Sequence, residues 1–145
     1  QKQRVAIAGI IAMKPRCMIF DESTAMLDPL GRREVLATME KLNREEGITV
    51  LSITHYMDEA ARADRVIVLS DGQILLDGTP GEVFAHADTL RTAGLDVPQC
   101  TAAVQYLQAR GVCIRGDLNT PEQCAAALLD AWRTRGGAGR TQAGK

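Results

Sequence analysis

Apolar runs and helical spacings follow one another along the first half of the chain. The apolar run over residues 17–20 has the pattern of a strand covered on both faces in a parallel sheet, and residues 48–53 predict a second strand. Between them, Asp28 with the following proline marks a helix start, apolar residues three or four positions apart mark one helical face, and Gly47 closes the helix. This strand–helix–strand order predicts an α/β fold with right-handed crossovers.

The remaining elements before residue 80 are shorter. Asp71-Gly72 predicts a tight hairpin turn, so the two strands that it joins are antiparallel. These strands are predicted at residues 66–69 and 73–76, and helices are predicted at residues 3–14 and 57–63.

After residue 80 the pattern changes to short helices, and we place a boundary there. Thr120, the proline after it and Gln123 form a capping-box pattern, which predicts a final helix. Residues 81–132 are therefore predicted to form a helical extension. Residues 133–145 contain arginine and glycine but no acidic residue, which favours a disordered tail.

Composition limits the possible functions. With 145 residues, 46% of them hydrophobic and 24% charged, the chain is typical of one globular domain with an appendage. A net charge of −1 with interspersed signs gives no reason to expect a nucleic-acid partner. The longest apolar run, Val5 to Met13, is well short of the roughly 20 residues that span a bilayer, so a membrane role requires a partner. Four cysteines without a C-x-x-C pair favour buried free thiols in a reducing cytosol over a metal site.

Two carboxylates, Asp21 and Glu22, stand side by side where the first strand ends. Ligands of open α/β sheets bind beyond the carboxyl ends of the strands, where a nucleotide hydrolase places its chemistry. Asp21 is suited to hold Mg²⁺, and Glu22 to polarise the water that attacks a γ-phosphate. By themselves these residues leave a second interpretation open, because adjacent acidic residues at strand ends are often solvated loop residues. His55, after the second strand, is by itself equally well a structural residue.

The order of four motifs makes the pattern specific. Residues 20–22 resemble a Walker B motif, residues 23–28 a D-loop, and His55 the switch histidine of ABC ATPases. Residues 1–8 resemble the end of this family's signature motif and the helix after it, with Gln1 as the last residue of the motif. The resemblance implies the carboxyl-terminal part of a P-loop (RecA-like) ABC ATPase sheet with helices on both faces, followed by the small helical extension.

The resemblance also implies what these motifs bind, namely ATP and Mg²⁺. It implies that Asp21 positions the magnesium ion, Glu22 orients the attacking water and His55 contacts the γ-phosphate. The resemblance places Asp28 at the interface between two ATPase subunits. Independently of the resemblance, an aspartate at this position can cap the helix that follows. Gln1 contributes to the site that the second subunit completes, so Gln1 and Glu22 serve different ATP molecules.

The chain shows no glycine-rich phosphate loop between a strand and a helix. The segment from Gly139 to Lys145 fits the letters G-x-x-x-x-G-K, but no predicted strand precedes it, so we interpret it as a chance match. We therefore expect a fragment that begins at the end of the signature motif and does not hydrolyse ATP alone. Ser23 stands where the family commonly has proline, with little expected effect on the chemistry.

Among ABC ATPases, residues 21–29, 54–60 and 94–98 resemble the energy-coupling factor transporters. This resemblance implies a peripheral subunit on the cytoplasmic face of the membrane that powers uptake of a transition-metal ion or a vitamin. The implied partners are a second ATPase subunit, a transmembrane coupling subunit and a substrate-binding membrane subunit, without nucleic acid. Two alternatives stay open. One is a DNA-repair or chromosome-organising ATPase, although no heptad run is visible, and the other is a non-catalytic module that responds to nucleotide.

Overall fold

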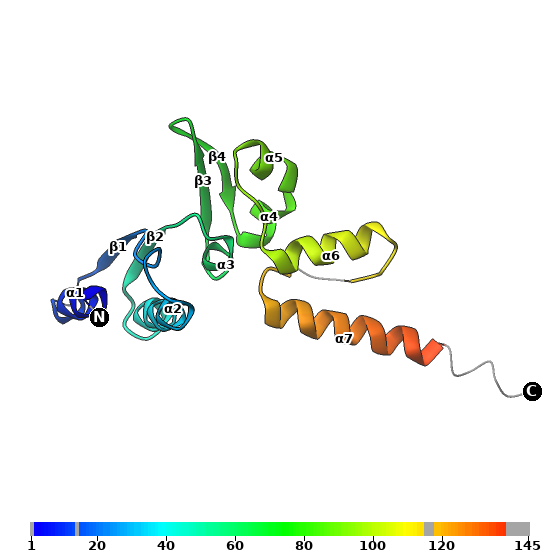
Figure 1. The fold of residues 1–145 in the computed structure, drawn as a ribbon, viewed down its shortest axis with the longest axis horizontal. Helices are drawn as coiled ribbons and strands as arrows, with labels where there is room; N and C mark the ends of the chain where they lie inside the picture. Colours follow the sequence, from blue (N-terminus) through cyan, green and yellow to red (C-terminus); the bar gives the residue numbers. More distant parts are fainter. Residues whose placement is uncertain (1, 14, 115–117, 139–145) are drawn as a thin grey trace, which may run out of the picture. The chain divides into compact units, whose positions relative to one another are not determined.

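Residues 2–13, 15–114 and 118–138 are described by the computed structural model shown in Figure 1. The chain forms two compact units, one up to His55 and one from Tyr56 onwards. The first unit contains helix α1 (Lys2–Ala12), strand β1 (Cys17–Asp21), helix α2 (Pro29–Arg44) and strand β2 (Thr49–Ile53). The boundary that the sequence pattern places near residue 80 differs from this division into compact units, and it stays a prediction.

Strands β1 and β2 form a parallel two-stranded sheet. Cys17 pairs with Thr49 and Asp21 pairs with Ile53, so both strands end at the same edge. Helix α2 connects the end of β1 to the start of β2, as a parallel pair requires. The predicted strand–helix–strand order and the α/β class are confirmed, with strand limits within one residue of those predicted.

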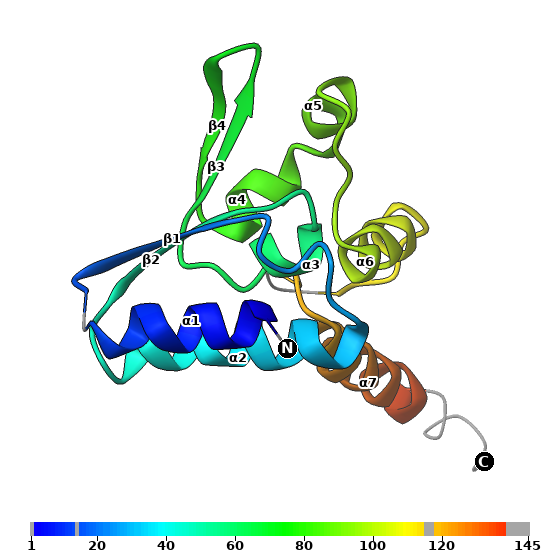
Figure 2. The same cartoon turned by 60° about the vertical axis from the view of Figure 1, so that its left-hand side comes forward.

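One face of this sheet is covered by helices. Met18 and Phe20 of β1 are 3% and 5% exposed and share a core with Val35 and Met39 of α2. Ile11 of α1 packs against the same core, and Figure 2 shows α1 and α2 side by side beneath the strands. The alternate residues of the strands are exposed on the other face, and they include Ile19, Leu51 and Ile53. The second helical layer that the family resemblance implies is therefore not part of the described unit.

Helix α2 begins where the sequence predicts, because Asp28 caps it. The Asp28 carboxylate accepts a hydrogen bond of 2.9 Å from the N–H of Gly31, and proline occupies the first turn. Val35 and Met39 lie on the buried face of the helix, and Leu36 is partly buried, in agreement with the apolar spacing.

Replacing Asp28 with alanine should lower the stability of the chain. The substitution removes the cap of α2 and takes this acceptor from the Gly31 N–H, which costs about 1 kcal/mol of unfolding free energy. Asp28→Asn keeps an oxygen acceptor of the same shape and should lose much less. Urea denaturation followed by circular dichroism measures both variants, and equal losses would contradict the capping role.

The second unit contains a hairpin and five helices among its described residues. Its elements are α3 (Met57–Ala60), β3 (Val66–Ser70), β4 (Gln73–Gly78), α4 (Pro80–Ala85), α5 (Ala87–Thr92), α6 (Gln99–Ala109) and α7 (Pro121–Ala138). Strands β3 and β4 are antiparallel, and the turn residues Asp71 and Gly72 have positive φ angles of 50° and 76°. Two positive φ angles are typical of a two-residue hairpin turn, so the predicted hairpin is confirmed.

Helices α4 and α5 supply the best-buried side chains of this unit. Val83, Phe84 and Leu90 are at most 2% exposed and share a core with the hairpin. A capping box starts α4: Thr79 Oγ1 accepts from the N–H of Glu82 at 3.4 Å, and the Glu82 carboxylate accepts from the N–H of Thr79 at 2.8 Å. The backbone and side-chain hydrogen bonds from Thr79 hold the pKa of Glu82 below its usual value.

Helices α6 and α7 pack against each other through a further core (Figure 1). This core contains Val104 of α6 and Cys124 of α7. The capping box predicted at the start of α7 is present. The Gln123 side chain accepts from the N–H of Thr120 at 3.2 Å, and the Thr120 hydroxyl accepts from the N–H of Gln123 at 3.4 Å.

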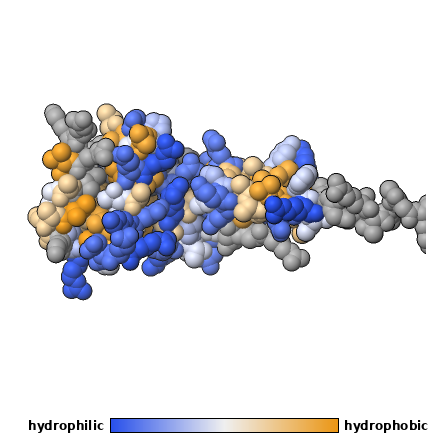
Figure 3. All heavy atoms as spheres, turned by 90° about the horizontal axis from the view of Figure 1, so that it is seen from below, coloured by the Kyte–Doolittle hydropathy of each residue, from blue (hydrophilic) through white to orange (hydrophobic). Residues whose placement is uncertain are grey.

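Helix α7 is longer than the sequence pattern predicts. It continues to Ala138, so residues 133–138 of the predicted disordered tail are helical, and residues 139–145 lie outside the described residues. The two arginines of this helical segment are good helix formers and no proline interrupts it, although its two glycines are poor helix formers. Leu129 and Trp132 of α7 are 54% and 74% exposed, and Figure 3 shows hydrophobic residues among hydrophilic ones at the surface. No described helix is both long and apolar enough to cross a membrane.

Candidate functional site

The predicted site residues lie at the carboxyl ends of β1 and β2. Asp21 is the last residue of β1, and the N–H of Glu22 donates to the carbonyl of Ile53, the last residue of β2, at 2.9 Å. This bond keeps the backbone of Glu22 beside the segment that leads to His55. The parallel register therefore brings together residues that are 33 positions apart in the sequence.

The Glu22 carboxylate contacts the His55 imidazole directly. Glu22 Oε1 lies 3.1 Å from His55 Nδ1, and the two side chains are 56% and 55% exposed. A carboxylate only accepts hydrogen bonds, so this contact places a proton on Nδ1. A pair this exposed contributes on the order of 0–1 kcal/mol to stability, so its importance lies in position rather than in stability. The sequence predicts both residues, but not that they touch.

The backbone of Glu22 has an uncommon conformation. Its φ angle is +44°, in the left-handed region that residues other than glycine rarely adopt. Such a conformation costs about 1–3 kcal/mol and persists where the surrounding structure imposes it, often at functional sites. The turn is held by a hydrogen bond of 3.1 Å from the N–H of Ala25 to the carbonyl of Glu22.

Thr24 is a residue of this turn that the sequence pattern does not single out. It is 2% exposed, and its carbonyl accepts from the N–H of Leu27 at 3.1 Å. A buried threonine directly after the two carboxylates helps to hold the turn that carries Glu22. Nothing in the apolar pattern could have revealed it, because its burial depends on the folded turn.

Asp21 is the residue that the sequence predicts as the magnesium ligand. It lies on the exposed face of β1 together with Ile19. The described residues contain no cluster of three His, Cys, Asp or Glu side chains that could hold a metal by themselves.

The two remaining predicted residues are Asp28 and Gln1. Asp28 Oδ1 is engaged by the N–H of Gly31, as the cap of α2. Gln1 lies outside the described residues. Their roles in ATP binding and at a subunit interface stay predictions.

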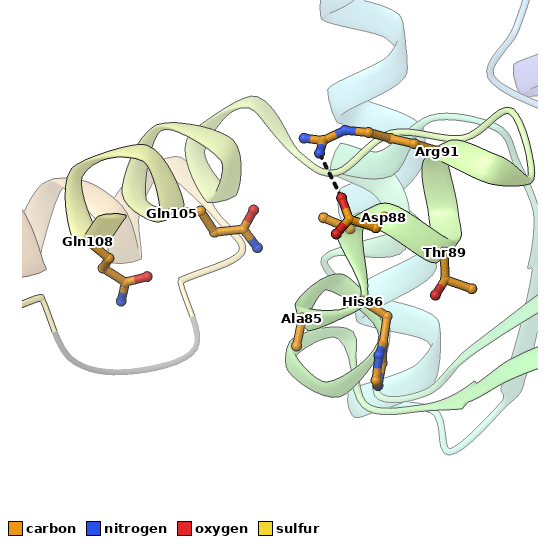
Figure 4. Close-up of a pocket in the computed structure, with 8 residues that line it drawn as sticks. Ala85, His86, Asp88, Thr89, Arg91, Gln105 and Gln108 are labelled. Atoms are coloured by element: carbon orange, nitrogen blue, oxygen red, sulfur yellow. Dashed lines mark hydrogen bonds and ion pairs between the residues drawn. The ribbon is translucent and has the colours of Figure 1, made fainter. Parts of the chain in front are cut away.

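A separate depression of about 560 Å³ lies in the second unit, between α6 and the segment of α4 and α5 (Figure 4). Its lining includes His86, Asp88, Arg91, Gln105 and Gln108. Arg91 is paired with Asp88 at 3.4 Å, and both glutamine side chains donate to backbone carbonyls. The depression contains none of the predicted site residues, and His86 is an exposed residue.

Comparison with solved structures gives the class of protein. CbiO1 from Clostridium perfringens, part of the ABC transporter complex cbiONQ, is 38% identical with a TM-score of 0.54, over 70% of this chain and 41% of CbiO1. An ATP-binding cassette solved as a dimer in a post-hydrolysis state with ADP and Pi is 35% identical, with a TM-score of 0.52 over 55% of this chain and 34% of the cassette. The predicted resemblance is confirmed, and the chain is homologous to ABC-type ATPases.

The curated relatives are more specific, although no protein-family model matches the chain. The energy-coupling factor transporter ATP-binding protein EcfA1 of Caldanaerobacter subterraneus subsp. tengcongensis is 60% identical over 123 residues, 85% of this chain and 44% of the relative. EcfA1 of Symbiobacterium thermophilum is 53% identical over 132 residues, 91% of this chain and 46% of the relative. Within the ABC ATPases, the chain is therefore homologous to energy-coupling factor ATP-binding proteins. It spans less than half the length of these relatives.

Proposed function

We propose that this chain supplies the hydrolytic residues of an ATP-binding subunit that powers an energy-coupling factor importer for a transition-metal ion or a vitamin. The observation that carries this proposal is the contact of 3.1 Å between Glu22 and His55 at the ends of two parallel strands. The named relatives support a transporter ATPase over a DNA-repair or chromosome ATPase, since they are transporter ATP-binding proteins.

Each residue of the site has a role that suits its side chain. Glu22 orients the attacking water and accepts its proton, and His55 contacts the γ-phosphate of ATP. Asp21 holds Mg²⁺, and a bound magnesium ion would neutralise charge on the phosphates during hydrolysis. The contact with Glu22 fixes the orientation of the His55 ring, so that the two side chains respond together to the phosphate.

The open site suggests that hydrolysis needs a second surface. Glu22 and His55 are each more than half exposed, whereas phosphoryl transfer benefits from a site that excludes bulk water. A second ATPase subunit would close the site, with Asp28 at the interface and Gln1 serving the ATP molecule held by the other subunit. The further partners are a transmembrane coupling subunit and a substrate-binding membrane subunit, and the ATPase lies on the cytoplasmic face of the membrane.

Replacing His55 with alanine in the complete ATP-binding subunit tests this function. Loss of a side chain that contacts the transferred phosphate should lower the Mg²⁺-dependent ATPase rate about 10²-fold. Release of inorganic phosphate measures the rate. His86→Ala is the matched control, because it removes an exposed histidine outside the site and should leave the rate unchanged.

Two outcomes would contradict the proposal. An unchanged rate in the folded His55→Ala subunit would remove His55 from the reaction. We also expect no ATPase activity from the 145-residue chain alone, because it shows no phosphate loop. Magnesium-dependent hydrolysis by the purified chain that disappears in its Glu22→Gln variant would overturn that expectation.

A further inference from the structure

Two cysteines meet where the helices of the carboxyl-terminal extension begin. Cys100 lies in the first turn of α6, and Cys124 lies in the first turn of α7. The Cys100 thiol donates to the carbonyl of Asn119 at 3.4 Å, and the Cys124 thiol donates to the carbonyl of Leu118 at 3.4 Å. Since these carbonyls belong to consecutive residues, both sulfur atoms face the same short segment.

Both thiols belong to the core between α6 and α7. Burial first, and then the neighbouring Cys100 thiol, raise the pKa of the Cys124 thiol to about 11. Cys100 packs against the core that contains Cys124, and both thiols donate to carbonyls of consecutive residues, so the two side chains lie near each other. Neither the spacing of the cysteines nor a C-x-x-C motif indicates this pair in the sequence.

Their surroundings hold the pair in place. Cys124 is 5% exposed in the core between α6 and α7, and Cys100 is partly buried against the same core. The Thr101 hydroxyl donates to the carbonyl of Leu118 at 2.9 Å, which ties the first turn of α6 to the segment before α7. The other two cysteines, Cys17 and Cys113, are exposed. The expectation of buried free thiols therefore holds for Cys124 but not for Cys17 or Cys113.

We propose that Cys100 and Cys124 form a redox modification site, at which a peroxide converts the two thiols into a disulfide that joins α6 to α7. Cys100 is the more exposed thiol and reacts first. Its sulfur attacks one oxygen of hydrogen peroxide, the O–O bond breaks, and sulfenic acid and water form. The sulfur of Cys124 then attacks the sulfur of the sulfenic acid, and the S–S bond forms as a second water leaves. In total, two thiols lose two hydrogen atoms and one peroxide becomes two molecules of water.

The disulfide changes the extension in a measurable way. It closes a loop between positions 100 and 124 of the sequence. A cross-link of this length removes conformational freedom from the unfolded chain, so the melting temperature of the extension should rise by on the order of 10 °C. Because the Cys124 thiol is largely protonated near neutral pH, the closing step should be faster at pH 9 than at pH 7.

Peroxide treatment of two matched variants tests the proposal. Cys17→Ser with Cys113→Ser keeps the pair, and the same protein with Cys124→Ser removes one partner. After peroxide treatment and alkylation, mass spectrometry should find the intact first variant two hydrogen atoms lighter than the untreated chain. Digestion should then yield the peptides of Cys100 and Cys124 linked to each other. Its melting temperature should rise and return to the original value with a reducing agent, whereas the second variant should show neither change.

Three results would overturn the proposal. In the first, Cys100 and Cys124 are both still alkylated at a peroxide concentration that oxidises Cys113 in the unsubstituted chain. In the second, disulfides form only between chains. In the third, Cys100 and Cys124 are linked but the melting temperature does not rise. The same peptide analysis of the unsubstituted chain keeps the test valid if a variant does not fold. In the unsubstituted chain, a link between Cys100 and Cys124 supports the proposal. No link between them, or links from these two cysteines only to Cys17 or Cys113, contradicts it.

Discussion

Replacing Glu22 with glutamine in the complete subunit should leave ATP bound but nearly stop its hydrolysis. Glutamine has nearly the same shape as glutamate and can still hydrogen-bond His55, but it cannot accept a proton from the attacking water. Loss of a general base lowers reaction rates by roughly 10²–10⁴-fold. Because the carboxylate is assigned to the chemical step, ATP should accumulate in a stable dimer of subunits.

Retention of radiolabelled ATP and size-exclusion chromatography measure the two parts of this result. Glu46→Gln is the matched control, because Glu46 is an exposed glutamate beyond the end of α2. Normal hydrolysis by Glu22→Gln would remove Glu22 as the base. Loss of ATP binding would show that the carboxylate is needed for binding rather than for the reaction.

Replacing Leu90 with alanine should strongly destabilise the second unit. Leu90 is 0% exposed and packs in one core with Val83 and Phe84. Truncating a fully buried leucine typically removes about 2–5 kcal/mol of unfolding free energy, through lost burial and the cavity left behind. Since domains are stable by roughly 5–15 kcal/mol, this is a large part of the total.

Leu129→Ala provides the comparison for this prediction. Leu129 also lies on a helix, but it is 54% exposed, so its truncation should change the unfolding free energy by only about 0.5 kcal/mol. Urea denaturation followed by circular dichroism measures both variants. Similar losses for the two would mean that Leu90 is not part of a tightly packed core.

The candidate site could be predicted in outline because parallel strands end at one edge of a sheet. Asp21 and Glu22 follow one apolar run and His55 follows the next, so their proximity follows from strand order. The direct contact of Glu22 with His55 could not be predicted. It depends on the left-handed φ angle of Glu22 and on the turn around buried Thr24, which no local pattern of residues specifies.

The sequence by itself determined the local elements of this protein. The cap at Asp28, the hairpin turn at Asp71-Gly72 and the capping box at Thr120 were predictable, because caps and turns act within a few residues. Only the tertiary structure decided which face of β1 is covered and that Cys100 and Cys124 belong to one core. These features depend on contacts between residues far apart in the chain, and such contacts form only when whole helices and strands pack together.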